Sequence, residues 1–109
     1  MTPATLSPRA RDDLVQAIRW IAKDNPTAAR VLREAVALAA DRIGTHPDIG
    51  VLRPDLAGEA YRFLVLVGFP YVIVYNPSRT PPRIVRILHG ARDIPGTLQL
   101  EAHSILRSS

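Results

Sequence analysis

The chain has 109 residues, of which 47% are hydrophobic and 22% are charged. This composition is typical of a folded protein and argues against extended disorder, and the length leaves room for one domain around one hydrophobic core. Because the chain contains no cysteine, disulfides, thiolate metal sites and cysteine nucleophiles are excluded.

The basic charge of the chain comes almost entirely from arginine. The 14 basic residues exceed the 10 acidic ones and give a formal net charge of +4, and Lys23 is the single lysine. Guanidinium groups bind carboxylates and phosphates, so charge alone leaves an acidic protein, a nucleic acid or plain solvation as interpretations. The N-terminus does not resemble a signal peptide, and no apolar stretch is long enough to span a bilayer. We therefore expect a cytoplasmic protein without a membrane partner.

Two amphipathic helices are predicted for the first half of the chain. Ser7-Pro8 indicates a helix start, because a serine oxygen can cap free N–H groups and proline suits the first helical position. Apolar residues then recur at helical spacing to about Asp24, with Asp12 and Asp13 near the positive end of the helix dipole. Asn25-Pro26 repeats the start signal, and a second apolar stripe runs to Gly44, where a helix can end. So short a connection predicts an antiparallel helical hairpin.

The second half is predicted to form a β-meander. Residues 45–59 are rich in proline, glycine and charge and are expected to form a loop with one short turn at most. Beyond this loop the apolar residues alternate. Runs rich in β-branched and aromatic residues, separated by turn-forming segments, predict three consecutive antiparallel strands at 60–67, 71–76 and 83–90.

These elements predict an α+β domain with the helical hairpin packed on one face of a mainly antiparallel sheet of three to four strands. The other face would then be free. Alternation places arginines among aliphatic residues on one face of the sheet, which is the composition of a docking surface. The candidate binding residues are those of this face and one arginine beyond the last strand, namely Arg62, Leu64, Leu66, Ile84, Arg86, Leu88 and Arg92.

Four motifs follow one another along the second half of the chain. They are Arg53-Pro54-Asp55-Leu56, Tyr61-Arg62-Phe63, Tyr71-Val72-Ile73-Val74-Tyr75 and, most specifically, the last strand running into His89-Gly90-Ala91-Arg92-Asp93. With the order of the predicted elements, these motifs resemble the ParE branch of the RelE/ParE toxin superfamily. The resemblance covers about residues 6–98, within one expected domain of residues 1–109 that ends in a tail at 99–109. The family usually opens with a longer edge strand, whereas only Ala4-Thr5-Leu6 could form it here, so this strand is expected to be short or missing.

The resemblance implies a toxin of a type II toxin–antitoxin system. Such a toxin is held by a cognate antitoxin, whose C-terminal segment wraps it as a helix and often adds a strand to its sheet, and the two proteins can form hetero-oligomers. Freed ParE-branch toxins are associated with inhibition of DNA gyrase, whereas RelE-branch toxins cut messenger RNA in the ribosomal A site. The fold does not decide between these activities, so the function has to be argued from the site.

The groups that a ribosome-dependent nuclease needs are incomplete in this sequence. RNA cleavage requires groups that activate the ribose 2′-hydroxyl, stabilise the phosphate charge and protonate the leaving oxygen. Tyr71-Val72 stands where the nuclease branch tends to have Tyr-Arg, and no tyrosine follows Tyr75. His89 is the best catalytic candidate, because histidine exchanges protons near neutral pH and a related nuclease subgroup uses one near this point. The favoured interpretation is nevertheless a hydrogen-bonded structural histidine at a strand end.

The remaining polar residues allow simpler interpretations beside the functional ones. Arg62 and Arg86 either bind an acidic segment or a phosphate, or they only solvate a sheet face. Arg92 and Asp93 are expected to pair with each other or with the helix layer. No spacing of His, Asp and Glu indicates a metal site, and no cofactor is expected.

We therefore predict a toxin that acts by binding, with DNA gyrase as its target, and that does not bind nucleic acid directly without a partner. The alternatives are a ribosome-dependent endoribonuclease of the RelE type and an inactive relative that only binds an antitoxin.

Overall fold

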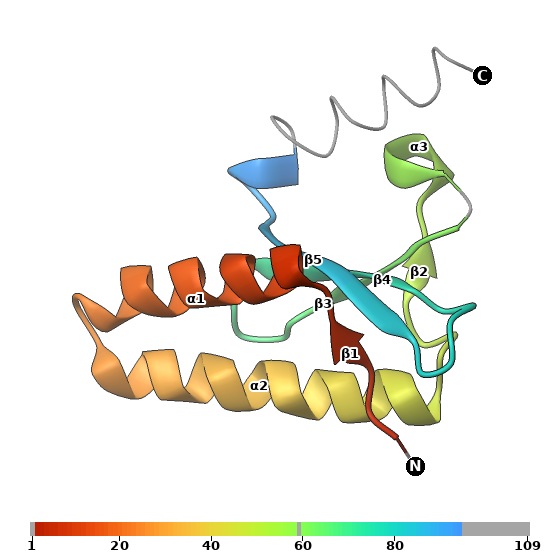
Figure 1. Ribbon diagram of the computed structural model, residues 1–109. Coiled ribbons are helices and arrows are strands. Elements are labelled where there is room, and N and C mark those ends of the chain that lie inside the picture. Colours follow the sequence, from red (N-terminus) through yellow and green to blue (C-terminus); the bar gives the residue numbers. More distant parts are fainter. Residues whose placement is uncertain (1, 59, 95–109) are drawn as a thin grey trace.

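A helical hairpin packs on a five-stranded sheet in the computed structural model, which confirms the predicted α+β class (Figure 1). The structure describes residues 2–58 and 60–94, so the tail at 99–109 lies outside the described residues. The sheet order is β1-β5-β4-β3-β2, and every pairing except the parallel one between β1 and β5 is antiparallel. The elements are β1 (Thr5–Leu6), α1 (Pro8–Ala22), α2 (Pro26–Thr45), β2 (Val51–Leu52), α3 (Pro54–Ala57), β3 (Arg62–Val65), β4 (Tyr71–Asn76) and β5 (Arg83–His89).

Both predicted helix starts are confirmed by their caps. The Ser7 hydroxyl accepts a hydrogen bond from the Ala10 N–H at 3.0 Å, and the Asn25 side chain accepts one from the Ala28 N–H at the same distance. Gly44 does not end α2, which continues to Thr45. A Cβ at Gly44 would lie 2.8 Å from Pro3 Cα, so this glycine allows the N-terminal segment to pass close to the helix.

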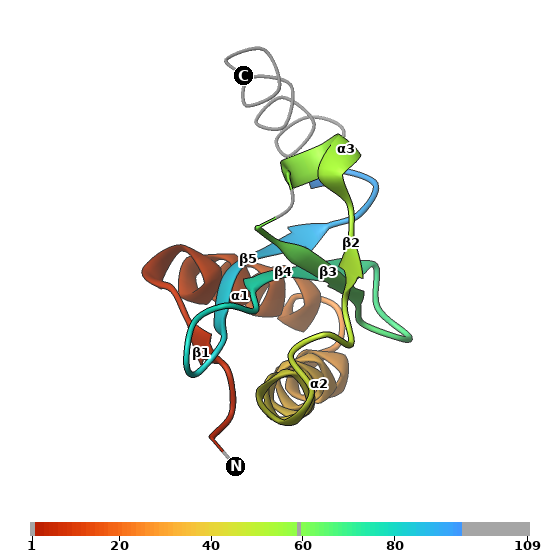
Figure 2. The same ribbon diagram turned by 90° about the vertical axis from the view of Figure 1, so that its right-hand side faces the viewer.

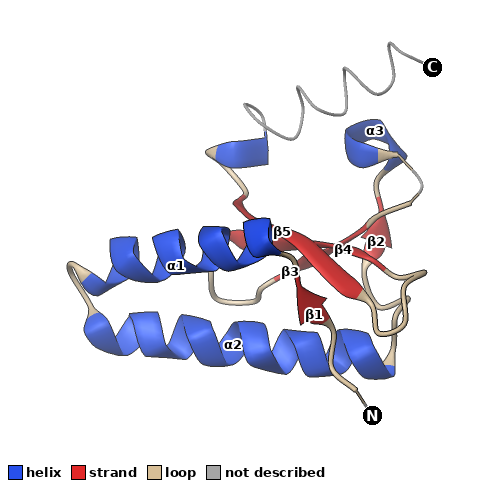
Figure 3. Ribbon diagram, in the orientation of Figure 1, coloured by secondary structure: helices blue, strands red, loops and turns tan. Residues whose placement is uncertain are grey.

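The three strands of the meander are present, and two short strands border them (Figure 3). β1 has two residues, in keeping with the expected short edge strand, and lies parallel to the start of β5. The expectation that residues 45–59 form only a loop is wrong, because β2 pairs with Arg62 and Phe63 of β3. A strand of two residues is too short to show alternation, and its pairing depends on β3, which follows after the end of this loop.

Apolar residues pack on both faces of the sheet, so the expectation of one free face is wrong. One cluster joins the helices to the sheet through residues that include Leu32, Ile43, Ile73, Tyr75, Ile84 and Ile87. The other face carries Phe63, Val74 and Leu88, with Tyr61 and Ile94 packed against them. On this side, α3 lies across the sheet from α2 (Figure 2).

A β-bulge explains why the expected face does not exist. Tyr75 pairs with Ile84 but the preceding Val74 pairs with Arg86, so β5 carries one extra residue at this point. As a result Ile84 packs toward the helices and Leu88 packs on the opposite face. Strict alternation, from which the shared face was predicted, cannot reveal an inserted residue.

Candidate functional site

A shallow apolar groove lies between α2 and β3, and we call it the α2–β3 groove. Its volume is about 290 Å³, and two of its valines, Val65 and Val67, are 63% and 92% exposed. The strand pairs of β2 end at Phe63, so the outer edge of β3 after this residue has no neighbouring strand among the described residues. An apolar groove beside an open strand edge can accept a partner segment. The lining residues are Ala35, Leu38, Ala39, Arg42, Leu64, Val65, Leu66 and Val67.

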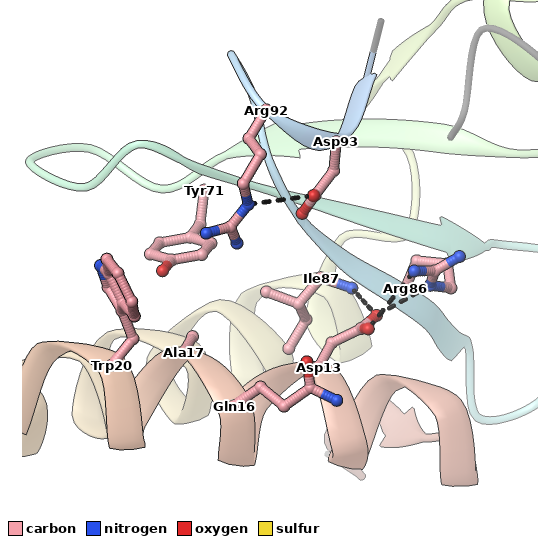
Figure 4. A pocket seen from close by; sticks show the side chains of 9 residues that line it. All are labelled: Asp13, Gln16, Ala17, Trp20, Tyr71, Arg86, Ile87, Arg92 and Asp93. Atoms are coloured by element: carbon pink, nitrogen blue, oxygen red, sulfur yellow. Dashed lines mark hydrogen bonds and ion pairs between the residues drawn. The ribbon is translucent and has the colours of Figure 1, made fainter. Parts of the chain in front are cut away.

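A second cavity, which we call the Tyr71 pocket, lies between α1 and β5, toward the opposite edge of the sheet (Figure 4). Its volume is about 280 Å³, and its lining is mostly polar. Four charged side chains, an exposed tryptophan and a buried tyrosine meet here. The lining residues are Asp13, Gln16, Ala17, Trp20, Tyr71, Arg86, Ile87, Arg92 and Asp93.

Asp13 binds α1 to β5 at the floor of this pocket. Its Oδ2 accepts hydrogen bonds from Arg86 Nε at 2.8 Å and from the Ile87 N–H at 2.9 Å. The Asp13 and Arg86 side chains are 14% and 16% exposed, so this ion pair is well shielded from water. Arg86 therefore holds the helix layer against the sheet and is not a solvated surface arginine.

His89 is held by hydrogen bonds at the end of β5. Its backbone N–H donates to Asp93 Oδ2 at 2.8 Å, and its ring nitrogen Nδ1 accepts from the backbone N–H of Arg92 at 3.1 Å. The His89 ring meets the Tyr71 ring edge to face, with the centroids 5.5 Å apart. This geometry matches the interpretation of His89 as a hydrogen-bonded structural residue.

The predicted pair of Arg92 and Asp93 is confirmed by a distance of 3.2 Å between Arg92 Nε and Asp93 Oδ1. Burial alone would raise the pKa of Asp93, but the hydrogen bond from the His89 N–H and the pairing with Arg92 outweigh it and leave the pKa below its ordinary value. Asp93 is therefore a carboxylate at neutral pH, and it joins the turn after β5 to the end of the strand.

Arg62 lies far from the Tyr71 pocket and closes the loop before β2. Its Nη1 donates to the Gly50 carbonyl at 2.7 Å. The same loop is held by Tyr75, whose hydroxyl donates to the Pro47 carbonyl at 2.6 Å and accepts from the Gly50 N–H at 2.9 Å. A Cβ on Gly50 would lie 2.7 Å from the Tyr75 ring, so this position requires glycine.

The structure separates the predicted binding residues into three groups. Leu64 and Leu66 line the α2–β3 groove, whereas Arg86 and Arg92 line the Tyr71 pocket. Arg62 belongs to the loop described above. Ile84 and Leu88 are 0% exposed, so we expect no direct contact between them and a partner. The sequence prediction missed Asp13 and Tyr75 as organising residues, because their partners are distant in sequence.

Neither a metal centre nor a membrane span is indicated in the described part of the chain. No group of three or more His, Cys, Asp or Glu side chains is placed there to hold a metal ion. Among the described helices, none has the length and apolarity that a membrane span needs.

Comparison with known proteins gives consistent matches. A family model described as the ParE toxin of the type II toxin–antitoxin system parDE matches residues 4–94. Toxin RelE3 of Caulobacter vibrioides is 30% identical over 89 residues, which are 82% of this chain and 95% of that protein. A solved chain of the chromosomal ParDE TA system from P. aeruginosa is 18% identical, with a TM-score of 0.68 over 82% of this chain and 96% of the other. At this identity the last match supports the fold alone.

Proposed function

The chain belongs to the ParE toxin family of type II toxin–antitoxin systems, and we propose that it acts by binding DNA gyrase and not by cutting RNA. Membership of this family implies an antitoxin partner. The choice of gyrase follows the association of ParE-branch toxins with this enzyme, and it places the action of the toxin in the cytoplasm.

One observation carries the preference for binding over cleavage: each arginine at the Tyr71 pocket faces a carboxylate. Arg86 is paired with Asp13, and Arg92 is paired with Asp93. A nuclease needs cationic groups that are available to the phosphate as charge develops in the transition state. Here an incoming phosphate would meet two carboxylates as well as two guanidinium groups, which weakens its stabilisation.

The position of His89 supports the same proposal. Its Nδ1 already accepts the Arg92 N–H, so the ring nitrogen on this side is occupied within the fold. Proton transfer through His89 would have to use Nε2 alone. A binding toxin requires no such transfer.

The proposal is tested by two assays on the same purified chain. We expect inhibition of gyrase supercoiling at concentrations comparable with that of the enzyme, and no cleavage of messenger RNA on ribosomes. Cleavage without supercoiling inhibition would contradict the proposal, and an inert chain in both assays would identify an inactive relative that only binds an antitoxin.

A ribosome-dependent endoribonuclease is the second candidate, because a relative with 30% identity bears the name Toxin RelE3. Replacing His89 by Gln separates the two candidates. We expect this variant to keep most of its growth inhibition, whereas a nuclease that uses His89 should lose roughly two orders of magnitude in rate. A thermal unfolding curve like that of the parent would show that any loss is not caused by misfolding.

We further propose that the antitoxin occupies the α2–β3 groove. The groove offers exposed aliphatic side chains, the open edge of β3 and one arginine, Arg42. This combination suits an amphipathic segment with acidic residues on its rim, and a complete interface should bury more than about 1,000 Å² in total. A complex in which the antitoxin contacts only the loop of residues 45–59 would contradict this placement.

A further inference from the structure

The Tyr71 pocket contains hydrogen-bond donors that the chain itself does not use. The Tyr71 side chain is 3% exposed, yet its hydroxyl has no hydrogen-bond partner within the described residues. Arg92 engages Asp93 through Nε, and its two terminal nitrogens have no such partner in the same part of the chain. The hydroxyl and these nitrogens face the same space beside Trp20 (Figure 4). No buried side-chain oxygen or nitrogen of the described residues lacks a partner, so the Tyr71 hydroxyl is open to the pocket, where a ligand that supplies an acceptor can replace water.

We propose that the Tyr71 pocket binds a carboxylate side chain on the surface of the toxin's protein target. The inference rests on the proposed function, in which the toxin acts by binding. Each oxygen of Asp13 and Asp93 already accepts at least one hydrogen bond within the fold, whereas the Tyr71 hydroxyl and the terminal nitrogens of Arg92 donate none among the described residues. A carboxylate can accept from the Tyr71 hydroxyl and the Arg92 guanidinium together.

The charges around the pocket favour a single carboxylate over a nucleic acid. The two arginines and two aspartates cancel, so the lining carries no net charge. A phosphodiester chain would bring repeated negative charges past Asp13 and Asp93, at a cost that grows with each phosphate near them. One carboxylate side chain limits this repulsion to a single negative charge, and its two oxygens can still accept from both unused donors.

The composition of the pocket rim is that of a protein interface. Trp20 is 62% exposed at the pocket, with Lys23 Nζ 5.1 Å from the centroid of its ring. Tryptophan, tyrosine and arginine are the residues that most often dominate the binding free energy of protein complexes. Trp20, Tyr71 and Arg92 meet at this one pocket.

The position of the pocket assigns it to the target and leaves the α2–β3 groove to the antitoxin. The pocket lies between α1 and β5, whereas the groove lies between α2 and β3, and β4 separates the two strands in the sheet. The groove is apolar and borders an open strand edge, which suits an extended partner segment. The pocket is small and polar, which suits one charged side chain on a folded surface. A toxin with two separate surfaces can be held by one protein and bind another.

Replacing Tyr71 by Phe tests the proposal, because it removes only the hydroxyl. The phenyl ring keeps its packing and its contact with His89, and no hydrogen bond of the described fold is lost, so the melting temperature should stay within about 2 °C of the parent. We expect the concentration for half-inhibition of gyrase to rise roughly tenfold, which is the usual loss when a hydrogen bond to a charged group is removed. Antitoxin affinity should change by less than about twofold.

Arg92→Gln should weaken inhibition in the same way, and the exposed pair with Asp93 that it removes should contribute little to stability. Arg79→Gln replaces an exposed arginine in the turn between β4 and β5 and serves as the control that removes an equal charge. Trp20 is the single tryptophan, so an unchanged emission spectrum shows that the pocket wall is intact in each variant. Unchanged inhibition by Tyr71→Phe would overturn the proposal.

Growth inhibition after induced expression separates this proposal from the proposed function. If the parent stops growth without inhibiting gyrase, and Tyr71→Phe weakens the growth effect, the proposal for the pocket is supported and gyrase is the wrong target.

Three outcomes would overturn the proposal. Equal losses of antitoxin affinity and inhibition in Tyr71→Phe would assign the pocket to the antitoxin. Tyr71-dependent binding of a short single-stranded RNA would overturn it in favour of a nucleic-acid site, and a parent chain inert in all assays would overturn both proposals.

Discussion

The two edges of the sheet differ in how their backbone hydrogen-bonding groups are satisfied. Along β5, after the two residues paired with β1, side chains of the chain itself take over: Ser7 Oγ donates to the Val85 carbonyl at 3.1 Å, and Asp13 accepts from the Ile87 N–H at 2.9 Å. Asp93 then accepts from the His89 N–H at 2.8 Å. On the outer edge of β3, pairing with β2 ends at Phe63, and the exposed side chains of Val65 and Val67 follow.

This difference determines where a partner strand can be added. An edge whose groups are already bonded to side chains offers little to an incoming backbone, whereas an open edge presents free donors and acceptors. The β5 edge is therefore closed by the fold, and strand addition is directed to β3. The following predictions test this contrast, from the largest expected effect to the smallest.

Replacing Asp13 by Ala should break the closed edge. The variant removes the carboxylate from a shielded ion pair and leaves the Ile87 N–H without its acceptor. We expect the free energy of unfolding in urea to fall by about 3 kcal/mol. Asp12→Ala is the matched control, because Asp12 is the exposed neighbour with the same charge, and it should change stability by less than about 0.5 kcal/mol. Equal losses in the two variants would show that Asp13 acts only through the helix dipole.

Replacing Val65 by Lys should block the open edge without harming the fold. Val65 is 63% exposed in the α2–β3 groove, so a lysine there can reach water, but it places a charge where we propose that the antitoxin packs. Antitoxin affinity should fall by roughly tenfold or more, equivalent to about 1.4 kcal/mol. Val15, 44% exposed on α1 and outside both sites, provides the control. If Val15→Lys weakens binding as much as Val65→Lys, the groove is not the antitoxin site.

Replacing Tyr75 by Phe should loosen the loop that brings β2 to β3. The hydroxyl donates a hydrogen bond to the Pro47 carbonyl and accepts one from the Gly50 N–H. In the variant the buried Gly50 N–H loses its acceptor. We expect a loss of about 1 kcal/mol in unfolding free energy. Amide hydrogen exchange should accelerate at Gly50 and in β2 more than in β5. Uniform acceleration across the sheet would show that the loop is not a separate unit.

Local sequence signals were sufficient for the two long helices and the three strands of the meander but not for β2, and long-range contacts were needed for the sites. The caps at Ser7 and Asn25 involve residues three positions away, so the helix starts could be predicted from the sequence. The ion pair of Asp13 with Arg86 joins residues 73 positions apart, and Asp13 could be interpreted from the sequence only through the helix dipole.

The binding surfaces were only partly predictable for the same reason. Alternation correctly grouped Leu64 with Leu66, because β3 is regular, but it failed in β5, where the bulge separates Ile84 from Leu88. The Tyr71 pocket combines residues of α1, β4, β5 and the following turn, so no single stretch of sequence indicates it.

The smallest effect should be a change of stability with pH that depends on Tyr75. Burial is the largest influence on this phenol and raises its pKa above the ordinary value of 10.0. Because the pKa is higher in the folded than in the unfolded chain, the stabilisation by the neutral phenol is complete below about pH 10 and is lost as the pH rises through the folded-state pKa. Urea unfolding at pH 8, 10 and 11 measures this loss. The difference in the free energy of unfolding between the parent and Tyr75→Phe should become smaller as the pH rises.

Other titrations affect the parent and the variant equally, which makes this difference interpretable. All titratable groups other than Tyr75 are the same in the two chains, so the background change with pH is common to both. Tyr61→Phe serves as a second control, since Tyr61 packs on the other face of the sheet and has no part in the loop. A constant difference between the parent and Tyr75→Phe from pH 8 to 11 would mean that the phenol keeps the same pKa on folding. The hydrogen bond that the hydroxyl donates to the Pro47 carbonyl would then contribute little, because a phenolate cannot donate it, and the loop would be held by the hydrogen bond from the Gly50 N–H, by packing and by Arg62.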